Sequence, residues 1–350
     1  MLKQPYRILV VDDSSVIRQA IVAIINSHDN LQVIGEATNG YEALKLIKQL
    51  KPDLVTLDVI MPKMSGLTTL KYIMIFYPTP VVMLSSLTKA GAAITFDALR
   101  YGAVDFIAKP SKLDNNSLRS QSNEIIQKIL SAVKVKINAI QYIRVKPKQT
   151  NISLPKISAK HVVVLGVAEG GYATLLKIIP RLLLQPLATY LIVFYESAIH
   201  INGFIEYLNQ YSQVLVTRTQ DNTILQTGVC YLSLGEEYVT VHEQQNHYRV
   251  HVSHAPFSSR RGSIDMLMFS VAESLGKRAL GVILTGAGSD GAEGLEELIR
   301  VGGGAIIQAP ISCLHKSMAL SALNTCEAET VVVDTEIATE INYFLKNLQS

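Results

Sequence analysis

The feature that most constrains the fold is an alternation of short apolar runs with amphipathic stretches, which occurs twice along the 350-residue chain. In the first series the apolar runs are RILVV, LQVIGEA, LVTLDV, PVVMLSS and VDFIAK, and helical patterns lie between them at residues 15–26, 40–50 and 90–99. Strands that alternate with helices form βαβ crossovers, which place the strands in a parallel sheet with helices on both faces. The sequence therefore predicts an α/β protein.

A second series of the same kind starts after Ala159. It predicts strands at residues 161–166, 191–194, 213–216, 228–232, 238–242, 248–254, 280–285 and 304–309, and helices at residues 172–184, 201–210, 264–275, 292–301 and 335–348. The alternating segment EEYVTVHEQQNHYRVHVSH is typical of a hairpin, and we expect it to add an antiparallel piece to a mainly parallel sheet. Together the two series predict two doubly wound, mainly parallel-sheet domains joined by a linker.

The segment between the two series has a different composition. Residues 123–143 keep a helical period, whereas the following RVKPKQTNISLPKISAK is polar and basic and contains two prolines. Such a composition is typical of an exposed tether between domains. We therefore predict a first domain over residues 5–124, a helical extension and basic linker over residues 125–158, and a second domain over residues 159–350.

Composition limits the classes of function. The chain is 48% hydrophobic and 17% charged with a net charge of +3, which suits two buried cores and does not indicate a nucleic-acid partner. The apolar run at residues 8–11 ends at Asp12 and Asp13, far short of a signal peptide, and no run is long enough to cross a membrane. The three cysteines are scattered without metal-ligand spacing. We therefore expect a cytoplasmic protein without membrane insertion.

Polar residues gather where the strands of the first series end. Asp12 and Asp13 follow the first strand, and Asp58 ends the third. Ser85 ends the fourth strand and Lys109 follows the fifth. The carboxyl ends of parallel strands share one edge of the sheet, and an all-oxygen cluster of carboxylates there suits Mg²⁺, with the lysine and hydroxyl able to hold a phosphoryl group. The alternative is that these acids only cap helices.

These residues belong to a larger pattern. The segments VVDDS, LDVIMPKMSG, SSLT and DFIAKP stand in register and closely resemble the receiver domain of two-component response regulators. The resemblance implies that Asp58 accepts a phosphoryl group from a histidine kinase. It also implies that Mg²⁺ is held by Asp12, Asp13, Asp58 and the backbone carbonyl of Ile60.

The same resemblance assigns roles to the remaining residues of the site. Ser85 and Lys109 would bind the phosphoryl oxygens, and Phe106 would be the aromatic side chain that reorients with Ser85. A cis peptide bond is expected between Lys109 and Pro110. The first domain is thus interpreted as a phosphorylatable receiver that uses Mg²⁺.

The second half carries its own diagnostic stretches. LGVAEGGY, at residues 165–172, predicts a sharp strand-to-helix turn of the kind that holds a nucleophile in many α/β enzymes. ALGVILTGAGSDGAEGLEEL, RRGSIDMLMFSVAE and GGGAIIQ accompany it. Together with the N-terminal half, these segments resemble the chemotaxis protein-glutamate methylesterase family. The resemblance implies hydrolysis of methylglutamate esters on chemoreceptors, and deamidation of receptor glutamines, by a serine–histidine–aspartate triad.

Two of the three triad positions are substituted in this chain. Aligned on the family's motifs, the serine position is Ala168 and the histidine position is Tyr195, whereas the aspartate is present as Asp290. Alanine has no atom that attacks a carbonyl, and tyrosine, with a pKa of about 10, is a poor base at neutral pH. Glu169 would also place a negative charge beside the developing oxyanion. The methionine of the aspartate motif is replaced by Ala287.

The sequence therefore predicts a phosphorylatable regulator of a chemotaxis-type pathway whose output domain is catalytically degenerate and acts by binding. The expected partners are a histidine kinase and the cytoplasmic tails of chemoreceptors, not nucleic acid. The alternative is an active methylesterase or deamidase that uses other groups, such as Ser197 with His200 or Glu169 with Asp290. The pattern does not favour a zinc site among the four histidines between residues 242 and 254, because strand alternation separates them.

Overall fold

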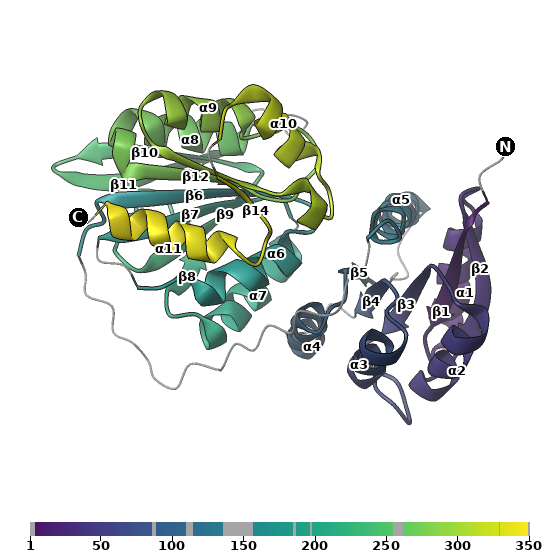
Figure 1. Ribbon diagram of the computed structural model, residues 1–350. Coiled ribbons are helices and arrows are strands. Elements are labelled where there is room, and N and C mark those ends of the chain that lie inside the picture. Colours follow the sequence, from purple (N-terminus) through teal and green to yellow (C-terminus); the bar gives the residue numbers. More distant parts are fainter. Residues whose placement is uncertain are drawn as a thin grey trace. The chain divides into compact units, whose positions relative to one another are not determined.

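The computed structural model describes residues 4–85, 89–109, 115–135, 157–184, 187–196, 198–254, 262–328 and 330–348. The chain divides into two compact units, Met1–Arg144 and Val145–Ser350 (Figure 1). Pro110, at which the cis peptide bond is expected, and Ser197 lie outside the described residues.

The first unit is a doubly wound α/β domain, as the sequence predicts. Its strands pair in parallel in the order β2-β1-β3-β4-β5. The strands are β1 (Tyr6–Val11), β2 (Leu31–Ala37), β3 (Leu54–Asp58), β4 (Val81–Ser85) and β5 (Asp105–Ala108). The helices are α1 (Ser15–Asn26), α2 (Gly40–Leu50), α3 (Gly66–Phe76), α4 (Lys89–Arg100) and α5 (Asn115–Ala132). Isoleucines of α1 and α5 pack together on one face of the sheet, and α2, α3 and α4 cover the other.

Helix caps and one glycine fix the loops that follow the strands of this unit. Ser14, Asn39 and Ser65 each cap the next helix by accepting a backbone N–H from its first turn, which would otherwise lack a partner. Gly66 lies so close to Asp58 that a Cβ at this position would come within 1.9 Å of the carbonyl oxygen of Asp58. The loop after β3 therefore packs tightly against the end of the strand that carries Asp58.

The second unit is also doubly wound, and its seven-stranded parallel sheet has the order β14-β13-β12-β6-β7-β9-β8. The strands are β6 (His161–Val167), β7 (Ala188–Phe194), β8 (Leu215–Arg218), β9 (Val229–Leu234), β12 (Ala279–Ile283), β13 (Gly304–Gln308) and β14 (Thr330–Val332). The helices are α6 (Gly171–Ile178), α7 (Ala198–Tyr211), α8 (Ser263–Leu275), α9 (Ala292–Arg300), α10 (Ser317–Thr325) and α11 (Ile337–Asn347). In Figure 1, α8, α9 and α10 lie on one face and α6, α7 and α11 on the other, so β6 and β7 are buried along their whole length.

The second unit differs from the sequence-based expectation in two respects. The hairpin of β10 (Glu237–Gln244) and β11 (His247–His254) is antiparallel, as predicted, but it forms a separate two-stranded sheet instead of joining the main one. It packs on α8, where Val241 donates its N–H to Oγ of Ser270 and Ser274 donates to the carbonyl of Val241. Helix α10 and strand β14 are not predicted by the pattern, because segments of nine and three residues are too short to establish a hydrophobic period.

Candidate functional site

Three carboxylates of the first unit converge at the carboxyl end of its sheet. Asp12 and Asp13 follow β1 and Asp58 ends β3, and one oxygen of each lies within 4.8 Å of the others. Asp12 and Asp58 are buried, whereas Asp13 is exposed. Lys109, directly after β5, places Nζ 2.8 Å from Oδ2 of Asp12 and 2.8 Å from Oδ2 of Asp58, and Ile60 donates its N–H to Oδ1 of Asp58 at 3.3 Å. One ammonium group thus contacts two of the three clustered carboxylates.

Burial and hydrogen bonding shift the pKa values of Asp58 and Lys109 in this cluster. Burial raises the pKa of Asp58, while the hydrogen bond from Lys109 acts against this rise by favouring the carboxylate. Burial alone would lower the pKa of Lys109, but its hydrogen bonds to Asp12 and Asp58 outweigh burial, so the pKa is raised. A hard divalent cation requires an all-oxygen donor set with excess negative charge. The residues present therefore fit Mg²⁺.

Two other expected residues of this site contact neighbouring residues of α4. Oγ of Ser85, at the end of β4, lies 2.7 Å from Oγ1 of Thr95. The ring of Phe106, on β5, packs edge to face with the ring of Phe96 at a centroid distance of 6.3 Å. Thr95 and Phe96 were not expected at this site, because the sequence shows them only as members of an amphipathic helix.

In the second unit, the turn between β6 and α6 is closed over by other parts of the chain. Ala168 at its tip is 0% exposed and donates its N–H to the carbonyl of Thr285. Gly170 has a φ of +84°, in the left-handed region that favours glycine. A Cβ on Gly286 would meet both Cβ of Ala168 and the sulfur of Met318. The position that the resemblance assigns to a nucleophile therefore belongs to the hydrophobic core.

The Glu169 side chain points back into the protein. Its Oε2 accepts the N–H of Ala287 at 2.8 Å, and its carbonyl oxygen accepts a hydrogen bond from Oγ1 of Thr285 at 2.9 Å. In acyl-transfer enzymes, backbone N–H groups beside the nucleophile stabilise the oxyanion. Here the N–H of Ala287 is bound by a carboxylate of the chain itself, which lies at the position next to Ala168.

Tyr195 and Asp290 are hydrogen-bonded to each other, and together they cap the start of α8. The Tyr195 hydroxyl donates to Oδ2 of Asp290 at 2.5 Å and accepts the N–H groups of residues 262 and 263 at 3.0 and 3.1 Å. Asp290 accepts the N–H groups of residues 264 and 265 at 3.1 and 3.0 Å. These are groups that the first turn of α8 leaves without partners in the helix. Burial, together with the nearby Asp290, raises the pKa of Tyr195 to about 12, so the phenol keeps its proton.

Asp265 completes this arrangement, and no motif of the sequence singles it out. From the first turn of α8 it accepts the N–H of Gly294, in the first turn of α9, at 2.7 Å. Asp265, which lies on α8, therefore caps α9, and Asp290, which lies just before α9, caps α8. Burial and the proximity of Asp290 raise the pKa of Asp265 to about 7. An acid in the first turn of a helix is common, so only the folded chain distinguishes this one.

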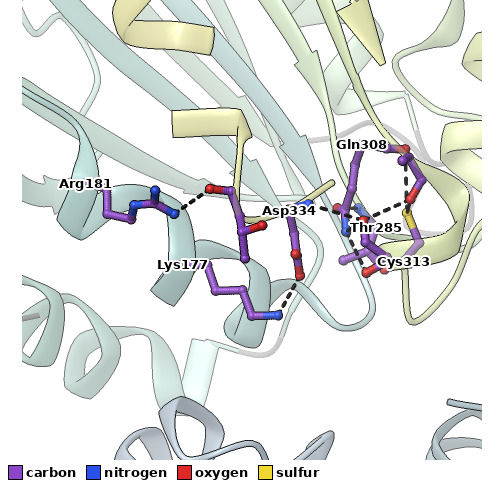
Figure 2. Close-up of polar contacts among 9 residues, drawn as sticks. Lys177, Arg181, Thr285, Gln308, Cys313 and Asp334 are labelled. Carbon is purple, nitrogen blue, oxygen red and sulfur yellow. Dashed lines mark hydrogen bonds and ion pairs between the residues drawn. The ribbon is translucent and has the colours of Figure 1, made fainter. Parts of the chain in front are cut away.

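Polar side chains hold the loops around this site in place (Figure 2). Thr285 donates its N–H to Oε1 of Gln308 at 2.9 Å, and Nε2 of Gln308 donates to the carbonyl of Ser312 at 2.9 Å. Lys177, on α6, pairs with Asp334 beyond β14 at 2.6 Å. Together with the contact between Thr285 and Glu169, these bonds tie the carboxyl ends of β6, β12 and β13 to one another.

The groups considered for a relocated activity have other partners. The carboxylates of Glu169 and Asp290 bind backbone N–H groups of different segments. His251 was considered only as a zinc ligand; its Nδ1 lies 2.9 Å from Asp221, and both side chains are more than half exposed. Within the described ranges, the three aspartates of the first unit are the one group of histidine, cysteine and acidic side chains close enough to share an ion.

A parallel sheet with a carboxylate cluster beside a lysine, joined in one chain to a second doubly wound unit, defines a response regulator with an output domain. Residues 8–120 match the family model described as response regulator receiver domain, and residues 163–341 match the model described as CheB methylesterase. The chain belongs to the family of chemotaxis response regulators with a CheB methylesterase domain.

Two relatives match almost the whole chain, and one solved structure matches its second unit. The chain is 36% identical over 333 residues to the protein-glutamate methylesterase/protein-glutamine glutaminase of Pyrococcus abyssi, covering 93% of this chain and 90% of the relative. It is 36% identical over 344 residues to the protein of the same name from Archaeoglobus fulgidus, covering 97% and 98%. The CheB methylesterase catalytic domain of Thermotoga maritima matches with a TM-score of 0.50 and 22% identity, covering 55% of this chain and 100% of that one, which confirms the fold of the second unit.

None of the helices in the described ranges combines the length and the apolar character needed to cross a membrane.

Proposed function

We propose that this protein is a phosphorylation-dependent regulator of a chemotaxis-type two-component pathway whose output domain binds its targets without hydrolysing esters. In this proposal residues 5–124 receive the phosphoryl group, residues 159–350 form the output domain and residues 125–158 join them. The observation that carries the proposal is the contact between Glu169 and Ala287 beside the buried Ala168. The position of the nucleophile has no attacking atom, and the neighbouring N–H is already bound.

Asp58 is the proposed phosphoacceptor. An oxygen of its carboxylate attacks the phosphorus of a phosphohistidine; the P–O bond forms as the P–N bond breaks, and the electron pair leaves with the imidazole nitrogen. Bound Mg²⁺ would neutralise charge on the phosphoryl oxygens, and the three clustered aspartates with the carbonyl of Ile60 would hold it. Lys109, with Nζ 2.8 Å from Asp58, and Ser85 are the proposed donors to the phosphoryl oxygens.

The output domain lacks both groups that start ester hydrolysis. An acyl-transfer triad needs a nucleophilic oxygen or sulfur and a base that accepts its proton. Ala168 offers no such atom, and Tyr195 keeps its proton because its pKa is raised to about 12 by burial and by Asp290. A carboxylate on the N–H of Ala287 would also oppose the negative charge that an oxyanion develops. These features support binding without turnover.

The proposed partners are a histidine kinase, which supplies the phosphoryl group, and chemoreceptor segments, which the output domain recognises; both would be met in the cytoplasm. Binding could present or withhold a receptor segment, compete with an active methylesterase, or draw phosphoryl groups from a shared kinase. Each of these roles uses phosphorylation at Asp58 as the input.

An active methylesterase or glutamine deamidase is the second candidate, and the names of the relatives favour it. The test is the release of methanol from methylated chemoreceptor segments in the presence of the phosphorylated protein. Release at the rate of a protein-free control supports the binding role, and faster release overturns it. Asp290 is a poor probe for this question, because its carboxylate caps α8 and its loss would disturb the fold.

Phosphotransfer tests the first half of the proposal. Incubation with a phosphorylated histidine kinase should label the wild type and leave Asp58→Ala unlabelled. Asp29→Ala, which removes an exposed carboxylate of the same unit, is the matched control and should label as the wild type does. Equal labelling of Asp58→Ala and the wild type would defeat the assignment of the phosphoacceptor.

A further inference from the structure

Two consecutive residues of α4 contact the two residues of the first unit that are expected to respond to phosphorylation. Thr95 lies 2.7 Å from Ser85, hydroxyl oxygen to hydroxyl oxygen. Phe96 packs its ring against Phe106 with an interplanar angle of 87°. Thr95 and Phe96 are each 1% exposed, and Ser85 and Phe106 are each 3% exposed. Both contacts are therefore shielded from water and tie α4 to the end of β4 and to the first half of β5.

The hydrogen bond between Ser85 and Thr95 holds the Ser85 hydroxyl against α4, with either of the two oxygens able to be its donor. A hydroxyl group carries one hydrogen, so it donates one hydrogen bond while it can accept others. Phosphoryl oxygens only accept, so Ser85 has to turn its one hydrogen toward a phosphoryl group on Asp58. A buried hydroxyl that loses a partner is costly, because no water replaces the lost bond. The contact at 2.7 Å therefore opposes any movement of Ser85 toward Asp58.

The aromatic contact acts on the same helix. Edge-to-face packing of Phe96 and Phe106 is a favourable geometry for two rings. Lys128 of α5 holds the backbone of Phe106 by donating from Nζ to its carbonyl at 3.0 Å. The backbone of Phe106 is thus anchored on the side of α5, and its ring is the part that contacts α4.

We infer that Thr95 and Phe96 form a latch that holds α4 against β4 and β5, and that Thr95 is the positioning residue whose bond to Ser85 is exchanged for a bond to the phosphoryl group. This inference rests on the proposed phosphorylation of Asp58. A phosphoryl group draws Ser85 away from Thr95, which removes one of the two contacts of the latch. Helix α4 is then the element of the receiver whose hold on the sheet depends on phosphorylation.

The test is the affinity of the full-length protein for beryllofluoride, a stable stand-in for a phosphoryl group, titrated in the presence of Mg²⁺ and followed by calorimetry. Thr95→Val removes the hydroxyl but keeps the shape, and it should tighten binding by about two- to tenfold, the range set by one buried hydrogen bond. Thr95→Ser keeps the hydroxyl and should bind as the wild type does. In a Ser85→Ala background, Thr95→Val should have no further effect.

Thr56→Val is the matched control. Thr56 is a 0% exposed threonine of β3, and within the described part of the chain its hydroxyl has no hydrogen-bond partner, so its replacement should leave the affinity unchanged. Equal binding by Thr95→Val and the wild type would overturn the latch alone. Weaker binding would also overturn it, because Thr95 would then orient Ser85 toward the ligand. No binding to the wild type would defeat the phosphoacceptor proposal and the latch together.

Amide hydrogen exchange provides a readout that a purely local packing change would not produce. Exchange across α4 should become faster in Thr95→Val without ligand, and beryllofluoride with Mg²⁺ should speed it up in the wild type as well. Exchange in α1, on the other face of the sheet, should be unchanged in both cases. Unaltered exchange in α4 under both conditions would contradict the latch even if the affinity changed.

Discussion

The two sites of this chain hold their charges in opposite ways. In the first unit, three carboxylates cluster together and one ammonium group contacts two of them, so negative charge remains for an external cation to balance. In the second unit, the carboxylates of Glu169, Asp290 and Asp265 each accept backbone N–H groups of the same unit. A site that works on an external ligand keeps groups in need of a partner, whereas the second site satisfies its polar groups internally, as buried groups require.

The largest expected effect comes from freeing the groups of the second site. The triple variant Ala168→Ser/Glu169→Thr/Tyr195→His restores a nucleophile, a base and an unoccupied N–H at Ala287. We expect it to release methanol from methylated receptor segments at least about 10²-fold faster than the wild type, since a positioned base alone contributes a factor of that order. Ala168→Ser by itself should remain at the background rate, because its hydroxyl has no proton acceptor.

This prediction would fail in either of two ways. A wild type that already releases methanol would show that the second site is not internally satisfied. A single Ala168→Ser variant as active as the triple variant would show that neither the contact between Glu169 and Ala287 nor the tyrosine at position 195 obstructs the chemistry.

The next effect concerns the stability of the second site. Tyr195→Phe removes a donor to Asp290 and an acceptor for two backbone N–H groups at the start of α8. We expect the free energy of unfolding of the second unit to fall by about 1–3 kcal/mol, because these buried groups lose a partner. The measurement is urea denaturation of the full-length chain. Tyr343→Phe, at a residue that is 63% exposed, is the control and should not shift the transition.

An unchanged transition in Tyr195→Phe would mean that the contacts of Tyr195 do not support the fold. The internal hydrogen bonds of the second site would then make no measurable contribution to the free energy of unfolding of the second unit.

A smaller effect is expected at the first site. Asp13 is the exposed member of the carboxylate cluster, so its removal should weaken cation binding with little effect on folding. We expect Asp13→Ala to reduce the affinity for Mg²⁺ about tenfold, which corresponds to about 1.4 kcal/mol. Calorimetric titration with magnesium chloride measures this, and Asp29→Ala should bind as the wild type does. Equal affinity of Asp13→Ala and the wild type would remove Asp13 from the proposed ligand set.

The last prediction is a dependence of stability on pH. Asp265 has a pKa of about 4 in an unfolded chain, and burial together with Asp290 raises it to about 7 in the folded protein. A raised pKa of this kind gives a contribution to stability that is full below about pH 4 and is lost as the pH rises through about 7. Denaturation midpoints of the second unit should therefore fall over this interval, and Asp265→Asn should flatten the fall. Parallel profiles for the two proteins would contradict the raised pKa of Asp265.

Most of the first site follows from the order of its strands. In a parallel sheet the carboxyl ends of the strands share one edge, so the positions of Asp12, Asp58 and Lys109 in the sequence are enough to predict that they meet. Thr95 was missed because its contact depends on how α4 docks against β4. An amphipathic period identifies the buried face of a helix, but it does not say which atom each side chain reaches.

At the second site, some features follow from the sequence alone and others depend on the tertiary structure. The sequence alone determined the two α/β domains, and it predicted a substituted nucleophile position at Ala168 and a triad aspartate at Asp290, because these depend on periodicity and on residue identity. Only the tertiary structure decided that Glu169 binds the N–H of Ala287 and that Tyr195 and Asp290 cap α8. These bonds join segments up to 118 residues apart, and their geometry is set by the packing of whole strands and helices.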